Sequence, residues 1–130
     1  MRALRMVWAA LVGYTVDYFL SIIFVSAGYA LANIATPDDL TFAQPIHVMV
    51  GLVLPVLMTM VGGGVAGRLA PLDPTPAGAL VGGIGLIEMA TGMLDIGGPH
   101  ALAFIIAQCV AVVGAAAVAT FVAYRRRSRI

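Results

Sequence analysis

Four long stretches of the chain are almost entirely apolar, and short polar segments separate them. A transmembrane helix needs about 20 mainly apolar residues to cross a hydrocarbon core that is roughly 30 Å thick. Each stretch is long enough to meet this requirement. The pattern therefore predicts four transmembrane helices, at about residues 6–32, 45–69, 77–96 and 101–124.

The connections between these stretches are short and contain turn-forming prolines at Pro37, Pro71, Pro74 and Pro99. Short connections predict that successive helices are neighbours in space and run in opposite directions. We expect an all-α membrane protein in which residues 1–130 form a single transmembrane domain, an antiparallel bundle of four transmembrane helices.

Composition agrees with a lipid environment, because 62% of the residues are hydrophobic and only 10% are charged. An average soluble domain carries roughly 25% charged residues. The single cysteine, Cys109, cannot form an internal disulfide. Motifs typical of nucleotide binding, serine hydrolysis or zinc proteolysis are absent from the sequence, as is a basic surface suited to nucleic acid. We expect no enzymatic activity, no catalytic residues, no cofactor, no metal and no nucleic-acid partner.

The basic residues all fall at one end of the predicted helices. Basic residues in short flanks are retained on the cytoplasmic side of a membrane. The opposite loops hold Asp38, Asp39 and Asp95 and neither Lys nor Arg. The pattern predicts a multi-pass protein of a bacterial inner (cytoplasmic) membrane, with the N- and C-termini in the cytoplasm. The topology anchors are Arg2, Arg5, Arg68, Arg125, Arg126, Arg127 and Arg129.

Two of these arginine positions allow another interpretation. The C-terminal arginines could bind anionic lipid, since each basic residue near such a leaflet contributes about 1 kcal/mol. Arg68 could pair with Asp73 across the adjacent turn, but extension toward lipid phosphates is the ordinary behaviour of an interfacial arginine.

Small residues on the predicted helices indicate where helices approach one another. Without a hydrophobic drive between helices in lipid, close packing relies on glycine and alanine. Gly63 and Gly67 are four residues apart, as are Gly78 and Gly82, so each pair lies on one helix face. These four glycines are the predicted packing positions, within the chain or between copies of it. Pro55 lies inside the second stretch and predicts a kink there.

The second stretch also carries a resemblance to a known group of proteins. The segment Gly62-Gly63-Gly64-Val65-Ala66-Gly67-Arg68-Leu69-Ala70, followed by a proline-containing turn and a glycine-rich third stretch, is similar to a segment of small four-helix bacterial inner-membrane proteins of unknown function. In those proteins Gly-Gly-x-x-Ala-x-Arg closes the second helix, often with an aromatic residue at the position of Gly64. The resemblance covers roughly a quarter of the chain and implies a fold and a location, without an activity.

Two acidic residues lie inside the predicted helices, where an ionisable group costs several kcal/mol unless it is paired or hydrated. Asp17 lies about 10 residues into the first helix from the arginine end, and Glu88 about 11 residues into the third. At 1.5 Å per residue, both lie roughly 15–17 Å deep, near the membrane midplane. Desolvation and mutual repulsion favour retention of one proton by the pair at neutral pH.

Other polar residues at similar depth complete a candidate intramembrane polar site. Helical spacing gives Asp17 and Glu88 small, polar neighbours on their own faces, which suits the interior of a bundle. We expect a small polar cavity that could bind a proton or a cation. The alternative is a purely structural set of hydrogen bonds that fastens the helices together. The candidate residues are Asp17, Glu88, Tyr14, Ser21, Thr59, Thr91 and Gln108.

Two histidines, His47 and His100, lie at the opposite ends of their helices from the arginines. Two imidazoles without a cysteine or a placed carboxylate are a poor metal site, so we expect hydrogen bonding at the interface instead.

Two functions follow from these patterns. The interpretation that needs no further assumption is a non-enzymatic helix-bundle subunit or interaction protein, with the bilayer and a homo-oligomer or a membrane-protein partner as its contacts. The alternative is a small proton- or cation-linked transporter or channel subunit that uses Asp17 and Glu88. Small four-helix multidrug exporters also have a carboxylate in the first helix, although the one-sided arginines of this chain predict a single orientation.

Overall fold

The computed structural model describes residues 1–36, 39–91 and 100–128, and these residues contain helices and no strands. The helices are α1 (Arg2–Leu31), α2 (Pro45–Val48), the π-helical turn η2 (Met49–Val53), α3 (Leu54–Leu69), α4 (Pro74–Ala90) and α5 (Ala101–Ser128). The predicted all-α class is therefore confirmed. Helices α2, η2 and α3 follow one another without a break and form one long element.

Three of these elements are long and apolar enough to cross a membrane, namely Arg2–Leu31, Pro45–Leu69 and Ala101–Arg126. They correspond to three of the four predicted spans. The predicted third span, 77–96, differs. Helix α4 begins earlier, at Pro74, because proline is favoured in the first turn of a helix, and it ends at Ala90. Its 17 residues extend about 25 Å, which is less than the thickness of a hydrocarbon core. Residues 92–96 of the predicted span lie outside the described part.

The end of α1 is fixed by a backbone turn at Asn33. Asn33 has a left-handed φ of 57°, a conformation that asparagine tolerates better than most residues. Its N–H donates to Ala30 O at 3.2 Å, and the N–H of Ile34 donates to Tyr29 O at 2.9 Å. This is the Schellman arrangement, which pairs carbonyl groups that the helix end leaves free. Buried Ile34 then packs with Leu40 and Val50.

The predicted kink at Pro55 takes the form of the π-helical turn η2, directly before α3. Proline has no N–H, so it cannot continue the regular helical ladder. In η2 the N–H of Leu54 donates to Met49 O, one residue further back than in an α-helix. The wider turn brings Pro55 into the first turn of α3, where a missing N–H costs little.

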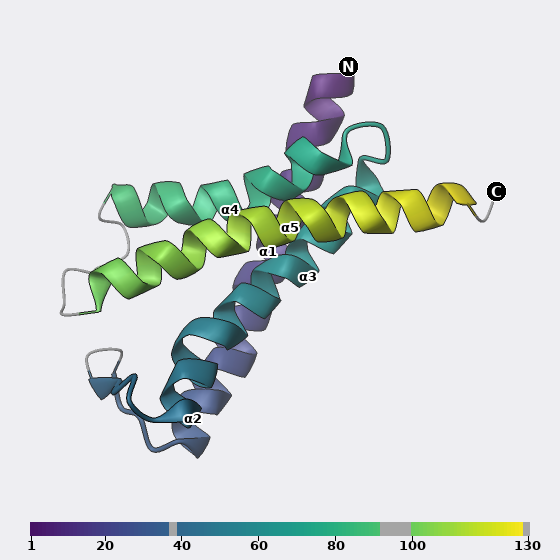
Figure 1. Cartoon of the computed structure of the whole chain (residues 1–130). Helices are drawn as coiled ribbons and strands as arrows, with labels where there is room; N and C mark the ends of the chain where they lie inside the picture. The colour runs from purple at the N-terminus through teal and green to yellow at the C-terminus, as the bar shows by residue number, and fades with distance from the viewer. Residues whose placement is uncertain (37–38, 92–99, 129–130) are drawn as a thin grey trace.

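The helices form two pairs that cross each other. Helix α1 packs along α3, and α4 packs along α5. In Figure 1 the pair α4 and α5 lies across the pair α1 and α3, and the ends far from the crossing diverge. Contacts of α3 with both α4 and α5, and of α1 with α4, hold the two pairs together at the crossing.

The centre of the crossing is a ridge of alanines on α5. Ala111, Ala115, Ala119 and Ala123 are at most 1% exposed. The four predicted packing glycines all lie against this helix: Gly63, Gly67 and Gly78 approach Ala115 or Ala119, and Gly82 approaches Val112. A Cβ atom on Gly67 would lie 2.3 Å from Ala119 O. The small residues therefore allow helix backbones within this chain to touch.

We expect the Gly67→Ala substitution to destabilise the fold by about 1–3 kcal/mol, because the new methyl group has to displace the backbone of α5. The matched control is Gly83→Ala on α4, where an added Cβ has no neighbour within 4 Å. That control should retain or slightly raise stability, since alanine favours helix more than glycine does. Thermal unfolding in detergent, followed by circular dichroism, measures both. Equal midpoints for the two variants would contradict the packing at Gly67.

Candidate functional site

A cavity of about 150 Å³ lies where α1, α3, α4 and α5 meet. Six of the seven residues predicted for the polar site line it, and Thr91 does not. The sequence therefore identified most of the polar lining, although the four helices that supply it are far apart along the chain. The lining residues are Tyr14, Asp17, Tyr18, Ser21, Pro55, Thr59, Gly85, Glu88, Met89 and Gln108.

Asp17 connects α1 to α3. Its side chain is buried, with 8% of the residue exposed. Ser21, one turn further along α1, donates its hydroxyl hydrogen to Asp17 Oδ1 at 3.1 Å. Thr59 of α3 donates to Asp17 Oδ2, also at 3.1 Å. This reach is possible because α1 and α3 touch one turn away, where a Cβ on Gly13 would lie 2.4 Å from Gly62 O.

Glu88 connects α4 to α1. The hydroxyl group of Tyr14 donates a hydrogen bond to Glu88 Oε1. This bond joins the two crossing helix pairs, because Tyr14 belongs to one pair and Glu88 to the other. Glu88 itself is only partly buried, in contrast to Asp17.

Both acids lie well along their helices from the arginine ends. Helices α1 and α4 begin four and three residues earlier than predicted, at Arg2 and Pro74. Asp17 is then about 22 Å along α1, and Glu88 about 21 Å along α4, in its last turn. These are lengths along each helix, and the predicted depth of 15–17 Å in the membrane stays a prediction. In the described structure they share the cavity, and each accepts hydrogen bonds from hydroxyl groups.

Gln108 places α5 at the same cavity. Its Nε2 donates to Gly82 O of α4 at 2.8 Å. The side chain passes over Gly85, where a Cβ would lie 2.6 Å from Nε2. Thr91 lies beyond the cavity and donates back to Ile87 O at 2.9 Å, so it closes the end of α4 instead of lining the site.

Four lining residues were not predicted. Three of them lie three or four positions from a predicted site residue, so helical spacing could have identified them. Tyr18 lies one turn from Tyr14, and their ring centroids are 6.4 Å apart. Pro55 lies one turn before Thr59, and Gly85 lies three residues before Glu88. Met89, which follows Glu88 directly, has no such relation to a polar residue, so sequence spacing gives no reason to select it.

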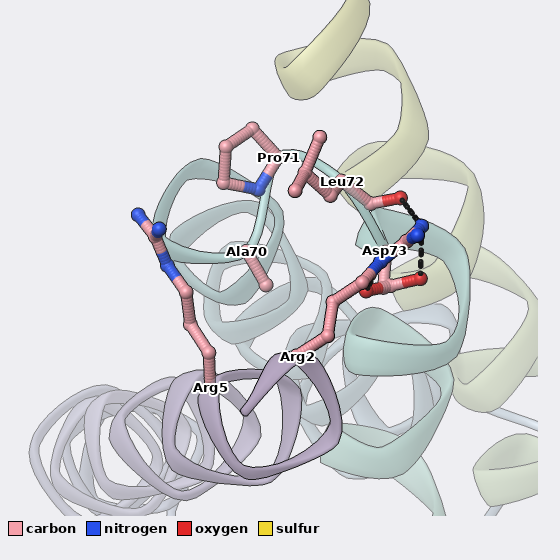
Figure 2. A pocket seen from close by; sticks show the side chains of 6 residues that line it. All are labelled: Arg2, Arg5, Ala70, Pro71, Leu72 and Asp73. Carbon is pink, nitrogen blue, oxygen red and sulfur yellow. Dashed lines mark hydrogen bonds and ion pairs between the residues drawn. The ribbon is translucent and has the colours of Figure 1, made fainter.

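A second cluster lies at the arginine end, around the turn between α3 and α4 (Figure 2). Arg2 donates to both carboxylate oxygens of Asp73, at 2.9 and 3.1 Å, and to Leu72 O at 3.3 Å. The prediction left open whether Asp73 pairs with Arg68. It pairs with Arg2, and the side chain of Arg68 is exposed.

Two further predicted anchors bind the last carbonyl groups of α3. Arg5 of α1 donates to Leu69 O at 3.1 Å, and Arg126 of α5 donates to Arg68 O at 2.6 Å. The last carbonyls of a helix lack partners within the helix, so cationic donors there are stabilising. The space between Arg2, Arg5 and the turn is only about 10 Å³, which is at most enough for one water molecule. The side chain of Arg127 and all of Arg129 lie outside the described residues.

The two histidines contact neighbouring residues of the segment before α2. His47 Nδ1 accepts a hydrogen bond from the Thr41 N–H at 2.8 Å. His100 packs on Phe42, with ring centroids 4.7 Å apart. Within residues 1–36, 39–91 and 100–128, no group of three or more potential metal ligands comes together.

Comparison of the chain with protein-family models, curated proteins and solved structures finds no match.

The Tyr14→Phe substitution removes the hydroxyl group that links the two helix pairs at Glu88. Hydrogen bonds between membrane helices contribute about 0.6 kcal/mol on average and up to about 1.7 kcal/mol, so a loss of stability in this range is expected. Tyr18→Phe is the control, because the Tyr18 hydroxyl makes no hydrogen bond to another described residue. Unfolding titrations in detergent with increasing SDS measure both variants. A larger loss for Tyr18→Phe would contradict the assigned bond.

Proposed function

We propose that the chain is an inner-membrane protein of four transmembrane helices in an antiparallel bundle, with both termini in the cytoplasm. The one-sided arginines support this orientation through the preference of basic flanks for the cytoplasm. Support for α4 as the fourth span comes from its apolar composition and its contacts with α1, α3 and α5. The resemblance of residues 62–70 to small bacterial membrane proteins agrees with this location.

Reporter fusions truncated after residues 36, 72, 98 and 130 test the proposed topology. Alkaline phosphatase should be active after residues 36 and 98, and green fluorescent protein should fluoresce after residues 72 and 130. Each site carries both reporters in turn, so that each is the control for the other. If the fusions after residues 72 and 98 report the same compartment, α4 does not span the membrane.

We propose further that this protein is a small proton- or cation-linked transporter or channel subunit. The observation that carries the proposal is the single cavity between all four long helices that contains both Asp17 and Glu88. An acidic residue at the centre of a transmembrane helix costs about 2.5–3.5 kcal/mol on insertion scales. A bound proton or cation offsets that cost, and acidic residues inside membranes commonly mark ion pathways.

The positions of the two acids suggest different roles. Asp17 is held within one helix pair, by Ser21 of α1 and Thr59 of α3, and it is almost fully buried. Glu88 accepts its bond from the other helix pair and is partly exposed. A proton or cation that binds Glu88 competes with Tyr14 for the carboxylate. Binding is therefore coupled to the contact between the pairs, which is the contact that has to change if access is to alternate between sides.

Flux into vesicles tests this proposal. The purified chain is reconstituted into liposomes that contain a pH-sensitive dye, and a gradient of protons or of a cation is imposed. The wild type should accelerate the pH change over protein-free vesicles. The Asp17→Asn and Glu88→Gln variants should each lower that rate by at least about tenfold, because the charge that offsets a cation is lost.

The matched control is Asp39→Asn, which neutralises an exposed acid that bonds to Thr36, away from the cavity. This variant should retain the wild-type rate. Unchanged flux in both cavity variants, or no flux above empty vesicles, contradicts the transport proposal.

A structural subunit is the second candidate function, and one observation favours it. The hydrogen bonds at the cavity join α1 to α3, α1 to α4, and α5 to α4. The same side chains can therefore serve only to stabilise the packing of the helices. A non-enzymatic bundle that assembles with copies of itself or with another membrane protein would need no more than this. This second function predicts that the partner complex is equally active with the wild type, with Asp17→Asn and with Glu88→Gln. The transport proposal instead predicts a loss of flux in both variants.

A further inference from the structure

Most of the hydrogen-bond donors that line the cavity around Asp17 and Glu88 already donate to other groups of the protein. The hydroxyl groups of Ser21, Thr59 and Tyr14 have one hydrogen each. Ser21 directs its hydrogen to Asp17, and Tyr14 directs its hydrogen to Glu88. The hydrogen of Thr59 is shared between Asp17 Oδ2 and Pro55 O, both at 3.1 Å. These three groups can then only accept hydrogen bonds from a molecule in the cavity.

Most of the polar atoms in the lining that can still bind a ligand are therefore hydrogen-bond acceptors. Glu88 Oε2 makes no bond to another described residue, and the hydroxyl oxygens keep their lone pairs. Gln108 uses one N–H on Gly82 O and retains its carbonyl oxygen together with one further N–H. The other side-chain donors in the lining are the hydroxyl group of Tyr18, on a residue that is 52% exposed, and any proton that the two acids hold between them. An acceptor-rich site with negative charge is complementary to a cation that carries N–H groups.

The rest of the lining is apolar, which argues against a bare metal ion. Pro55, Gly85 and Met89 form part of the wall, together with the rings of Tyr14 and Tyr18. Calcium takes six to eight oxygen ligands, and magnesium requires an octahedral set. Here the lining combines carboxylate, hydroxyl and amide groups with carbon, sulfur and aromatic surface, so a full set of oxygen ligands is not provided. A cation with an apolar portion fits both kinds of surface, and aromatic rings attract such cations.

The volume of the cavity matches a small cation. About 150 Å³ equals the liquid volume of roughly five water molecules. Pockets for drug-sized ligands usually span about 300–1,000 Å³. The volume therefore suits a ligand of only a few non-hydrogen atoms.

We propose that the ligand of this cavity is a small primary or secondary alkylammonium ion. Its N–H groups donate to Glu88 and to the hydroxyl oxygens beside Asp17, and its short alkyl chain packs against Pro55, Met89 and the ring of Tyr18. This assignment rests on the proposed cation-linked function and specifies its substrate class.

Isothermal titration calorimetry on the purified chain in detergent micelles tests the assignment. The probes are ethylammonium, n-propylammonium, tetramethylammonium, sodium and potassium, each as the chloride salt. Ethylammonium and n-propylammonium should bind at least about tenfold more tightly than tetramethylammonium, which lacks N–H groups, and than either metal ion. This comparison uses the wild type alone, so it does not depend on the folding of any variant.

Variants then locate the binding to the cavity. Glu88→Gln and Asp17→Asn should each weaken ethylammonium binding by at least about tenfold, and Asp39→Asn should leave it unchanged. Size-exclusion profiles identify any variant that fails to fold.

The possible results separate this assignment from the transport proposal. Binding of ethylammonium without flux in vesicles supports the ligand class and contradicts transport. Tighter binding of sodium or potassium than of ethylammonium overturns the ligand class and leaves cation-linked transport standing. Equal binding of tetramethylammonium and ethylammonium overturns the role of the N–H groups. No binding of any probe overturns the ligand class, and the flux measurement alone then decides proton-linked transport.

Discussion

Direct contact between helix backbones is the constraint on which the rest of this structure depends. In lipid, apolar side chains gain little by leaving their solvent, so helices associate where small residues let backbones approach. The alanine ridge of α5 lies between the glycines of α3 and α4, and Gly13 meets Gly62 between α1 and α3. Because these contacts fix where the helices cross, they also decide which polar side chains face one another. Asp17 reaches Thr59, and Gln108 reaches Gly82, only because no larger side chain separates the helices.

The polar groups inside the bundle obey a second rule, which is that a buried polar atom needs a partner. No buried side-chain nitrogen or oxygen among the described residues lacks one. The hydroxyl groups satisfy the carboxylates, and this arrangement leaves acceptors without matching donors in the cavity. The same hydrogen bonds that stabilise the helix contacts thus set the balance of donors and acceptors in the cavity.

Much of this arrangement could be predicted from the sequence, and the remainder depends on tertiary contacts. Apolar length predicted three spans well, with 45–69 matching Pro45–Leu69 at both ends, because the requirement is set by lipid thickness alone. Helical spacing placed Asp17 with Ser21, which belong to one helix. The partners of Glu88 and Asp73 are Tyr14 and Arg2, which lie 74 and 71 residues away, and only the packing of helices determines such pairs. The start of α4 was also missed, because composition does not show that Pro74 begins the helix.

The arginine bonds at the end of α3 also bear on the order of assembly during synthesis. Leu69 O binds Arg5, which the ribosome adds long before α3. Arg68 O binds Arg126, which lies near the end of the chain. The cap on α3 is therefore completed in two stages, the first available as soon as α3 emerges and the second only after α5 has been translated. Until then this helix end keeps one carbonyl group for water or lipid, so the final turn of α3 should be the last part of the first helix pair to become rigid.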